Sequence, residues 1–178
     1  MKIDFLKENC TKAPWQHGLG FIKLYMKGYE LNFHSHLIPS PTKNLHSHTK
    51  NFTSICLFGK IKNIIYKYEE VSKSDWVLER VTCQAGETPA TVCSNVNPII
   101  VSEEIQNEGD SINHRYNNIH DTQLLSKHAC TKLYSDRRVE DALIIRNKSK
   151  EFECAYQNLG TPKDNWEIIE IILNEKGA

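Results

Sequence analysis

The feature that most constrains the fold is a succession of short β-type segments separated by turn residues. Runs rich in Ile, Val, Tyr and Phe alternate with Gly, Pro, Asn and Ser at close intervals. We count about eight to ten such runs, which favours an antiparallel sandwich or a small barrel. The expected strands cover 20–26, 29–37, 44–58, 60–68, 76–83, 97–102, 129–135 and 142–147. We expect loops at 38–44, 84–96 and 103–112, and a hairpin at Gly59 joining the strands before and after it.

Helix signals stand at the two ends of the chain. Residues 3–12 favour a short helix or an arm across the domain. Near the C-terminus, Thr161 is a suitable N-cap and Pro162 suits the first helical position. Apolar residues then recur at helical spacing, which predicts a helix over about 162–175. With 178 residues, the sequence predicts a single all-β domain over 1–178 that ends in a short helix.

Composition restricts the function classes. Lys and Arg together number 22, as do Asp and Glu, so the formal net charge is zero. A broad nucleic-acid-binding surface needs a basic excess, and we expect none. The sequence contains no apolar run of the roughly 20 residues that span a membrane, and its polar first residues do not resemble a signal peptide. We therefore expect a cytoplasmic protein whose six scattered cysteines, with no C-x-x-C pair, are free thiols.

The candidate site begins at the run His46-Ser47-His48. Residues two apart on a strand point to the same face, so both imidazoles can bind one metal ion. Pro39 and Pro41 exclude a helix that runs into the pair. A second pair, at 34 and 36, is expected to line the same cavity or to be exposed rather than to bind metal. Imidazole suits iron, zinc, copper and nickel, so the ligand type alone leaves the metal open.

The residues after this run carry a resemblance to a known family. His46 and His48 are followed by Phe52 and, after six further residues, by Gly59. This pattern resembles the first motif of the cupin superfamily, in which a His-x-His pair precedes a Glu ligand and a Gly. Phe52 stands where the family has its Glu. The resemblance covers about 20–147 and implies a jelly-roll barrel, a double-stranded β-helix, with one metal in its mouth.

A second stretch resembles the second cupin motif in part. Gly109 and His120 have the spacing of that motif's first Gly and its His ligand, and Asn117 falls at the second Gly. Arg115 and Leu124 replace the family's Pro and Asn. The resemblance therefore implies that His120 is the third ligand. On the residues alone, the histidines at 114 and 128 are its rivals.

Without the Glu, the chain looks closest to the three-histidine branch of the cupins, which includes the thiol dioxygenases. In that branch a Tyr lies beside the metal, and the corresponding residue here is Tyr134, a candidate for proton transfer. Thr53 replaces a cysteine that some members crosslink to this Tyr, and Lys132 replaces a further histidine, so oxidation of a thiol is not implied.

The resulting functional hypothesis is a mononuclear non-haem iron oxygenase that acts on a small polar molecule. His46, His48 and His120 would hold one divalent metal ion, Fe(II) by preference, with Zn, Ni or Mn as alternatives. Two other functions remain open: a non-catalytic cupin that binds a small ligand or acts as a sensor, and a metal-dependent isomerase or lyase. The family also implies a homodimer. No nucleic-acid or membrane partner is expected.

Overall fold

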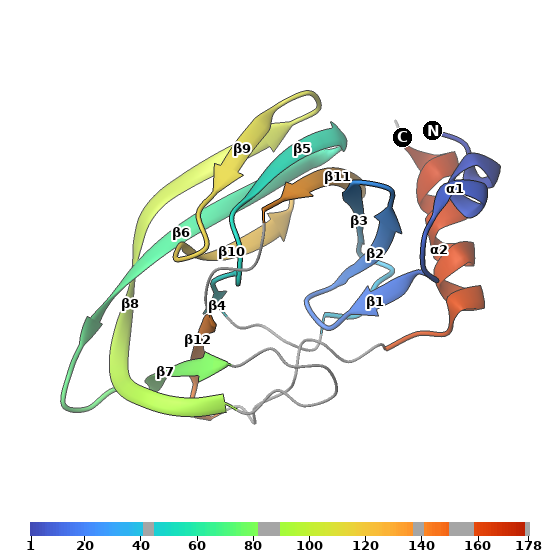
Figure 1. Cartoon of the computed structure of the whole chain (residues 1–178). Helices are drawn as coiled ribbons and strands as arrows, with labels where there is room; N and C mark the ends of the chain where they lie inside the picture. Colours follow the sequence, from blue (N-terminus) through green and yellow to red (C-terminus); the bar gives the residue numbers. More distant parts are fainter. Residues whose placement is uncertain (41–44, 82–89, 137–140, 150–158, 177–178) are drawn as a thin grey trace.

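The computed structural model describes residues 1–40, 45–81, 90–136, 141–149 and 159–176. Most of these residues belong to β-strands, which form two antiparallel sheets (Figure 1). Helix α1 (Ile3–Asn9) and helix α2 (Pro162–Glu175) lie together beside one sheet. Among the described residues, no helix has the length and apolar character needed to cross a membrane.

The first sheet holds six antiparallel strands in the order β1-β2-β3-β11-β5-β9. Their bounds are β1 Trp15–His17, β2 Phe21–Met26, β3 Tyr29–Ser35, β11 His128–Ser135, β5 Phe52–Phe58 and β9 Ser111–His114. Strands β2 and β3 form the hairpin that the sequence indicates around Lys27 and Gly28. The expected strands at 20–26, 29–37 and 129–135 are confirmed to within about two residues at their ends.

The second sheet follows the order β10-β4-β12-β7-β8-β6. Its strands are β10 Ile119–Leu124, β4 Leu45–His46, β12 Ala142–Asn147, β7 Trp76–Val81, β8 Ala90–Asn107 and β6 Lys60–Glu70. Strand β6 also pairs with β10, so the two ends of this order are hydrogen-bonded to each other. The expected strands at 60–68, 76–83 and 142–147 are confirmed where the structure describes them.

The main hydrophobic core lies between the first sheet and helix α2. Leu24 and Phe33 project from one face of β2 and β3 and pack against the buried Ile169 and Ile172 of the helix. The other face of the same strands carries polar side chains, among them Asn32. In the sequence, apolar and polar residues alternate over 29–37, which predicts this division into an apolar and a polar face.

Helix α2 begins as the sequence predicts. The Thr161 side chain accepts a hydrogen bond from the backbone N–H of Asp164 at 3.2 Å, and Pro162 occupies the first turn. This cap satisfies one of the backbone donors that a helix leaves unpaired at its N-terminus. The predicted bounds, 162–175, are confirmed.

The hairpin predicted at Gly59 is wrong. Strand β5 pairs with β11 and β9, whereas β6 pairs with β8 and β10, so Gly59 is the point where the chain crosses from one sheet to the other. Its backbone has φ +80°, and a Cβ atom there would lie 2.2 Å from the carbonyl oxygen of His128. A glycine is therefore required both by conformation and by space.

Two predicted loops are also corrected. Strand β8 runs over Ala90–Asn107, through residues expected in the loops at 84–96 and 103–112, and β9 begins at Ser111. The acidic residues suggested a loop, but they stand on the exposed part of the strand, where Glu103 pairs with Lys62 of the neighbouring strand at 3.2 Å. Residues 84–89 and 41–44 of the expected loops lie outside the described residues.

We predict that Gly59→Ala destabilises the protein by about 3 kcal/mol or more, because the methyl group meets backbone atoms and the left-handed conformation is strained. Gly28→Ala is the matched control, since Gly28 has φ +86° but has nothing within 4 Å of the place that an added methyl group would take. It should cost only about 1 kcal/mol. Urea unfolding of both variants measures the difference, and equal losses would contradict the crossing-point role of Gly59.

Candidate metal centre

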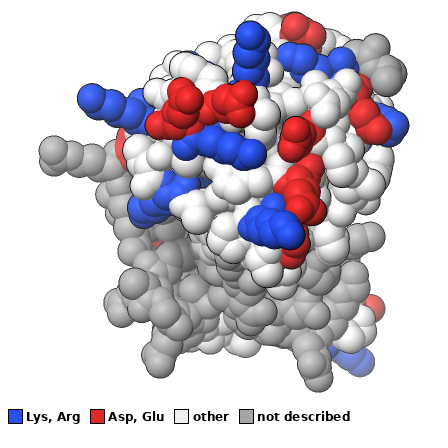
Figure 2. Space-filling model, turned by 90° about the vertical axis from the view of Figure 1, so that its right-hand side faces the viewer, with Lys and Arg blue, Asp and Glu red and all other residues white. Residues whose placement is uncertain are grey.

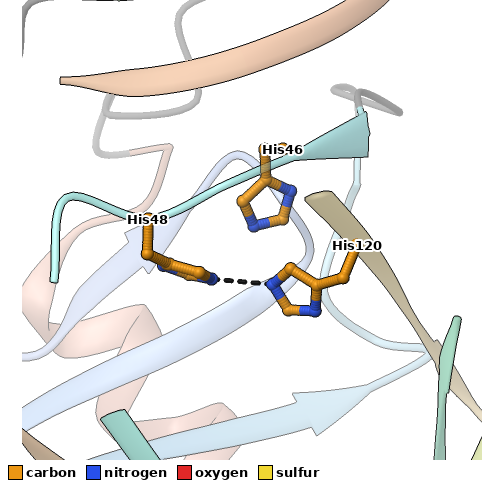
Figure 3. A group of neighbouring side chains, drawn as sticks. All are labelled: His46, His48 and His120. Atoms are coloured by element: carbon orange, nitrogen blue, oxygen red, sulfur yellow. Dashed lines mark hydrogen bonds between the residues drawn. The ribbon is translucent and has the colours of Figure 1, made fainter. Parts of the chain in front are cut away.

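Two strands and the segment after one of them bring three histidines together. His46 ends β4, His48 lies two residues later, and His120 belongs to β10, where it pairs directly with His46 (Figure 3). The strand expected over 44–58 is therefore interrupted after His46 and resumes at Phe52. His48 is nevertheless fixed, because its backbone N–H donates to the carbonyl oxygen of Tyr116 at 3.1 Å.

Ser47 fixes the backbone between the two histidines through two hydrogen bonds with Leu143. Its backbone N–H donates to the carbonyl oxygen of Leu143 at 2.8 Å, and its side-chain oxygen accepts from the Leu143 N–H at the same distance. Ser47 is buried, so its hydroxyl satisfies a backbone donor that water could not reach. The two flanking imidazoles are thus carried by a backbone that is held on both sides.

The geometry of the three side chains suits a single metal ion. One ring nitrogen from each histidine lies within 4.8 Å of the other two, and the Nε2 atoms of His48 and His120 are 2.7 Å apart (Figure 3). Two imidazole ligands at right angles, each about 2.1 Å from a metal, have nitrogens about 3 Å apart. The Nδ1 atom of His120, on the other side of that ring, is buried and has no hydrogen-bond partner among the described residues.

The surroundings keep two of the candidate ligands, His48 and His120, neutral. Burial lowers the pKa of His120 well below its usual range, and the neighbouring His46 and His48 lower it further. Burial also lowers the pKa of His48, with added effects from His46 and His114. A metal binds the neutral imidazole, so the protein holds these rings in the form that binds.

An aromatic wall closes one side of the site. The Phe52 ring meets the His48 ring edge-on, with ring centroids 4.5 Å apart. It also stacks on His114, again at 4.5 Å. The His114 ring lies 4.9 Å from that of His120, yet His114 is not part of the group whose nitrogens converge. The rival ligand His114 is therefore a packing neighbour of the triad.

The triad opens into a cavity of about 430 Å³ between the sheets. Six of the eight histidines line it, since His17, His34 and His114 join the three candidate ligands. His36 is exposed instead. His128, the other rival ligand, lies outside this lining and bonds Ser35 at 2.9 Å and Glu175 at 2.9 Å. Of the roles that the sequence left open for His34, the structure shows that it lines the cavity.

His17 is a cavity residue that the sequence alone did not indicate. It belongs to the short strand β1 and stacks on Phe21 with ring centroids 4.6 Å apart. Its Nδ1 atom accepts a hydrogen bond from the Leu19 N–H at 3.3 Å. No spacing motif in the sequence connects His17 with the histidines that lie after it, and only the pairing of β1 with β2 places it at the cavity.

The structure does not bring Tyr134 to the triad. Thr131, Leu133 and Ser135 of β11 line the cavity, so Tyr134 projects from the opposite face of the sheet, because side chains alternate along a strand. Its side chain is 42% exposed and lies near Lys132 and Tyr29. The prediction that places this tyrosine beside the metal for proton transfer is therefore corrected.

The cysteines that the structure describes take no part in the candidate site. Cys10, Cys56, Cys93 and Cys130 are free thiols, as expected, and none of them lines the cavity. Burial raises the pKa of Cys56 to about 11, which keeps its thiol protonated and unreactive. Cys83 and Cys154 lie outside the described residues.

Comparison with known proteins adds no assignment. No protein-family model matches the chain, and no curated protein is found to be similar to it.

The buried neutral histidines make the metal-free protein sensitive to acid. Burial lowers the pKa of His17 to about 3, with help from Lys23, and burial together with His46 lowers the pKa of His114 to about 4. Each of these two neutral histidines makes its full contribution to stability above pH ~6.5, which is the histidine pKa in the unfolded chain. The contribution is lost as the pH falls towards the lower pKa of the folded protein. Between neutral pH and pH ~5, each should cost up to about 2 kcal/mol.

Urea unfolding in a chelator at the two pH values measures this loss. The variant His114→Gln should lose less stability on acidification than the wild type, because one neutral histidine has been removed. His36→Gln, which alters an exposed histidine, should lose as much as the wild type. An identical pH dependence in all three proteins would contradict the assignment.

Proposed function

We propose that this protein is a cupin-type metalloprotein, a mononuclear non-haem iron oxygenase that acts on a small polar molecule. The observation that carries the proposal is the convergence of His46, His48 and His120 at the wall of a cavity of about 430 Å³. A jelly-roll arrangement is part of the proposal. It is supported by two antiparallel sheets on either side of the site and by the pairing of β6 with β10.

The donor set supports redox chemistry at an open site. Three imidazoles occupy one side of a metal ion and leave further coordination positions open to substrate and dioxygen. Iron(II) held there would supply the one-electron steps that dioxygen needs in order to react with an organic molecule. The family resemblance implies a carboxylate ligand where this chain has Phe52, whose ring packs on His48, so the proposed site has three protein ligands and no carboxylate.

The cavity walls support a small substrate. A volume of about 430 Å³ is at the lower end of the range for small-molecule sites. Apolar side chains, including Phe52, Ile144 and Leu133, line it together with polar groups such as Asn32 and Asn63. The apolar wall limits the water around the triad, and the amides offer hydrogen bonds that orient a polar molecule.

A second candidate function is a non-catalytic cupin that binds a small ligand at the same metal. One observation favours it: Tyr134, the residue that the family resemblance offers for proton transfer, faces away from the cavity. The cavity histidines have depressed pKa values because of burial, so they are poor proton acceptors near neutral pH. Oxygen consumption separates this candidate from the oxygenase.

We predict that the protein, expressed without a histidine tag or added metal, contains about one iron per chain. In His46→Ala and His120→Ala the bound metal should fall to about a tenth or less, because each removes one of three ligands. Elemental analysis measures the content, and a rise in melting temperature on metal addition provides a second measure. His36→Ala, with its exposed histidine, is the matched control and should keep both properties.

The identity of the bound metal also separates the alternatives. Zinc, nickel or manganese in place of iron would move the proposal to isomerase or lyase chemistry. A wild-type protein without stoichiometric metal, together with a melting temperature that no added metal changes, would overturn the metal site itself.

We further predict that Tyr134→Phe retains full metal content and leaves oxygen uptake unchanged within about twofold. The physical reason is its position on the outer face of β11, away from the triad. An oxygen electrode with the iron-loaded protein and a panel of small acids and thiols measures uptake. A large loss of turnover in Tyr134→Phe, at unchanged iron content, would show that this tyrosine reaches the site.

A further inference from the structure

The wall of the cavity carries a cluster of three charged side chains. The Lys23 Nζ atom lies 2.9 Å from a Glu30 carboxylate oxygen, and the Lys50 Nζ atom lies 3.7 Å from the other oxygen. Lys23 and Glu30 are close across the β2–β3 hairpin, whereas Lys50 follows His48 by two residues. All three line the same cavity as the histidine triad. Figure 2 shows that charges of both signs are also spread over one outer face of the molecule, so this cluster is distinguished by its place in the cavity rather than by its charge alone.

Partial burial of these three charges lowers the stability of the fold, so a purely structural role does not explain the cluster well. The side chains of Lys23 and Glu30 are 18% and 17% exposed, and that of Lys50 is 34% exposed. Charges that leave water lose solvation, and an apolar set of the same shape often stabilises a fold as well or better. Two ammonium groups and one carboxylate also leave the cluster with one excess positive charge.

The remaining charge in the cavity wall does not cancel this excess. Among the described residues that line the cavity, the only other Asp, Glu, Lys or Arg is Asp121. His120 points into the cavity, and neighbouring side chains on a strand point to opposite faces, so the Asp121 carboxylate projects to the outer side of β10.

The cluster lies close to the triad. The positive charge of Lys23 contributes to the low pKa of His48, after burial, His46 and His114. Lys50 is two residues after His48 in the chain, so it also lies near this histidine. A metal held by three neutral imidazoles would keep its full positive charge, so the metal and the two lysines would both attract negative charge.

We propose that the cavity binds a small organic acid whose carboxylate is held by Lys50 beside Lys23, while a second donor atom of the same molecule reaches the histidine triad. This inference rests on the proposed metal centre and adds the class of substrate. Lys50 is the binding group because Glu30 is already satisfied by the shorter contact with Lys23. The longer contact leaves the Lys50 ammonium, on a flexible stem with three donors, available to an acid.

The arrangement also explains why Glu30 is retained. Burial raises the pKa of Glu30, but Lys23 and Lys50 outweigh this effect and lower it, so the carboxylate is ionised. It holds the two ammonium groups at the cavity wall in the absence of substrate. A bound acid then replaces the Glu30 contact of Lys50 without the loss of the Lys23–Glu30 pair.

The test uses the full chain loaded with cobalt(II), whose absorption reports the binding of a thiolate. Mercaptoacetate and mercaptoethanol are the two probes, since they share the sulfur donor and differ in the acid group. The measured quantity is the ratio of their dissociation constants. In Lys50→Gln, the preference for the acid should fall about tenfold relative to the wild type, because a charge-assisted contact is lost.

Three variants make the test specific. Lys50→Arg should keep the preference, because it keeps the charge. Glu30→Gln should increase the preference, because it removes the competing carboxylate. Lys27→Gln, an exposed lysine in the same hairpin as Lys23 and Glu30, should behave as the wild type. A Glu30 role limited to stability would lower the melting temperature without changing the ratio, and that result counts against the proposal.

Different results would contradict the metal centre and the role of Lys50. A wild-type protein that takes up no cobalt overturns the metal centre and, with it, the inference. A protein that takes up cobalt but shows the same acid preference in Lys50→Gln overturns only the role of the lysine. If neither probe, or only mercaptoethanol, binds to the cobalt-loaded wild type, the proposed binding of an acid by Lys50 is likewise overturned and the metal centre is not.

Discussion

The pairing of β4 with β10 is the contact on which the candidate site depends. It consists of a single registered pair, His46 opposite His120, on a β4 strand of two residues. Strand β4 is held on its other side by β12, and β10 is held by β6 through six registered pairs. The short strand thus has its position fixed by longer neighbours, and a change in their register by one residue would turn one imidazole away from the other.

The environment of the triad is unusual in being rich in imidazole and poor in carboxylate. Most histidine ligands in metalloproteins pass their second ring N–H to a carboxylate or carbonyl. Here the Nδ1 atom of His120 has no such partner in the described part of the chain, and the neighbour that packs on His48 is the apolar ring of Phe52. The charged side chains of the cavity lining are Lys23, Glu30, Lys50 and Asp121, so two of the four are carboxylates and none of them belongs to the triad.

The sequence was most informative where the signal was local. Alternation in 29–37 predicted which residues of β3 face the core, and the Thr161 cap predicted the start of α2. Both depend on neighbours in the chain. The paired spacing of His46 and His48, with His120 placed by motif spacing, predicted the three histidines that converge.

Features that depend on distant segments were not predictable in this way. Gly59 signals a turn, but only the tertiary structure shows that it joins two sheets. The length of β8 could not be predicted, because its charged residues suggest a loop in the sequence but lie on the exposed part of a strand. The face of the sheet on which Tyr134 lies depends on the register of β11. The family resemblance could not predict this register, so it could not predict where the side chain points. His17 reaches the cavity only because β1 pairs with β2.

The separation of the triad along the chain has a consequence for how the protein is made. His48 and His120 are 72 residues apart, and the five strands β5 to β9 lie between them. During synthesis the first two histidines leave the ribosome while the third has yet to be added, so a nascent chain offers only a two-ligand site. Pairing over such a distance also closes a long loop and is slow. A metal ion that needs all three histidines would therefore bind only after β10 has paired with β4.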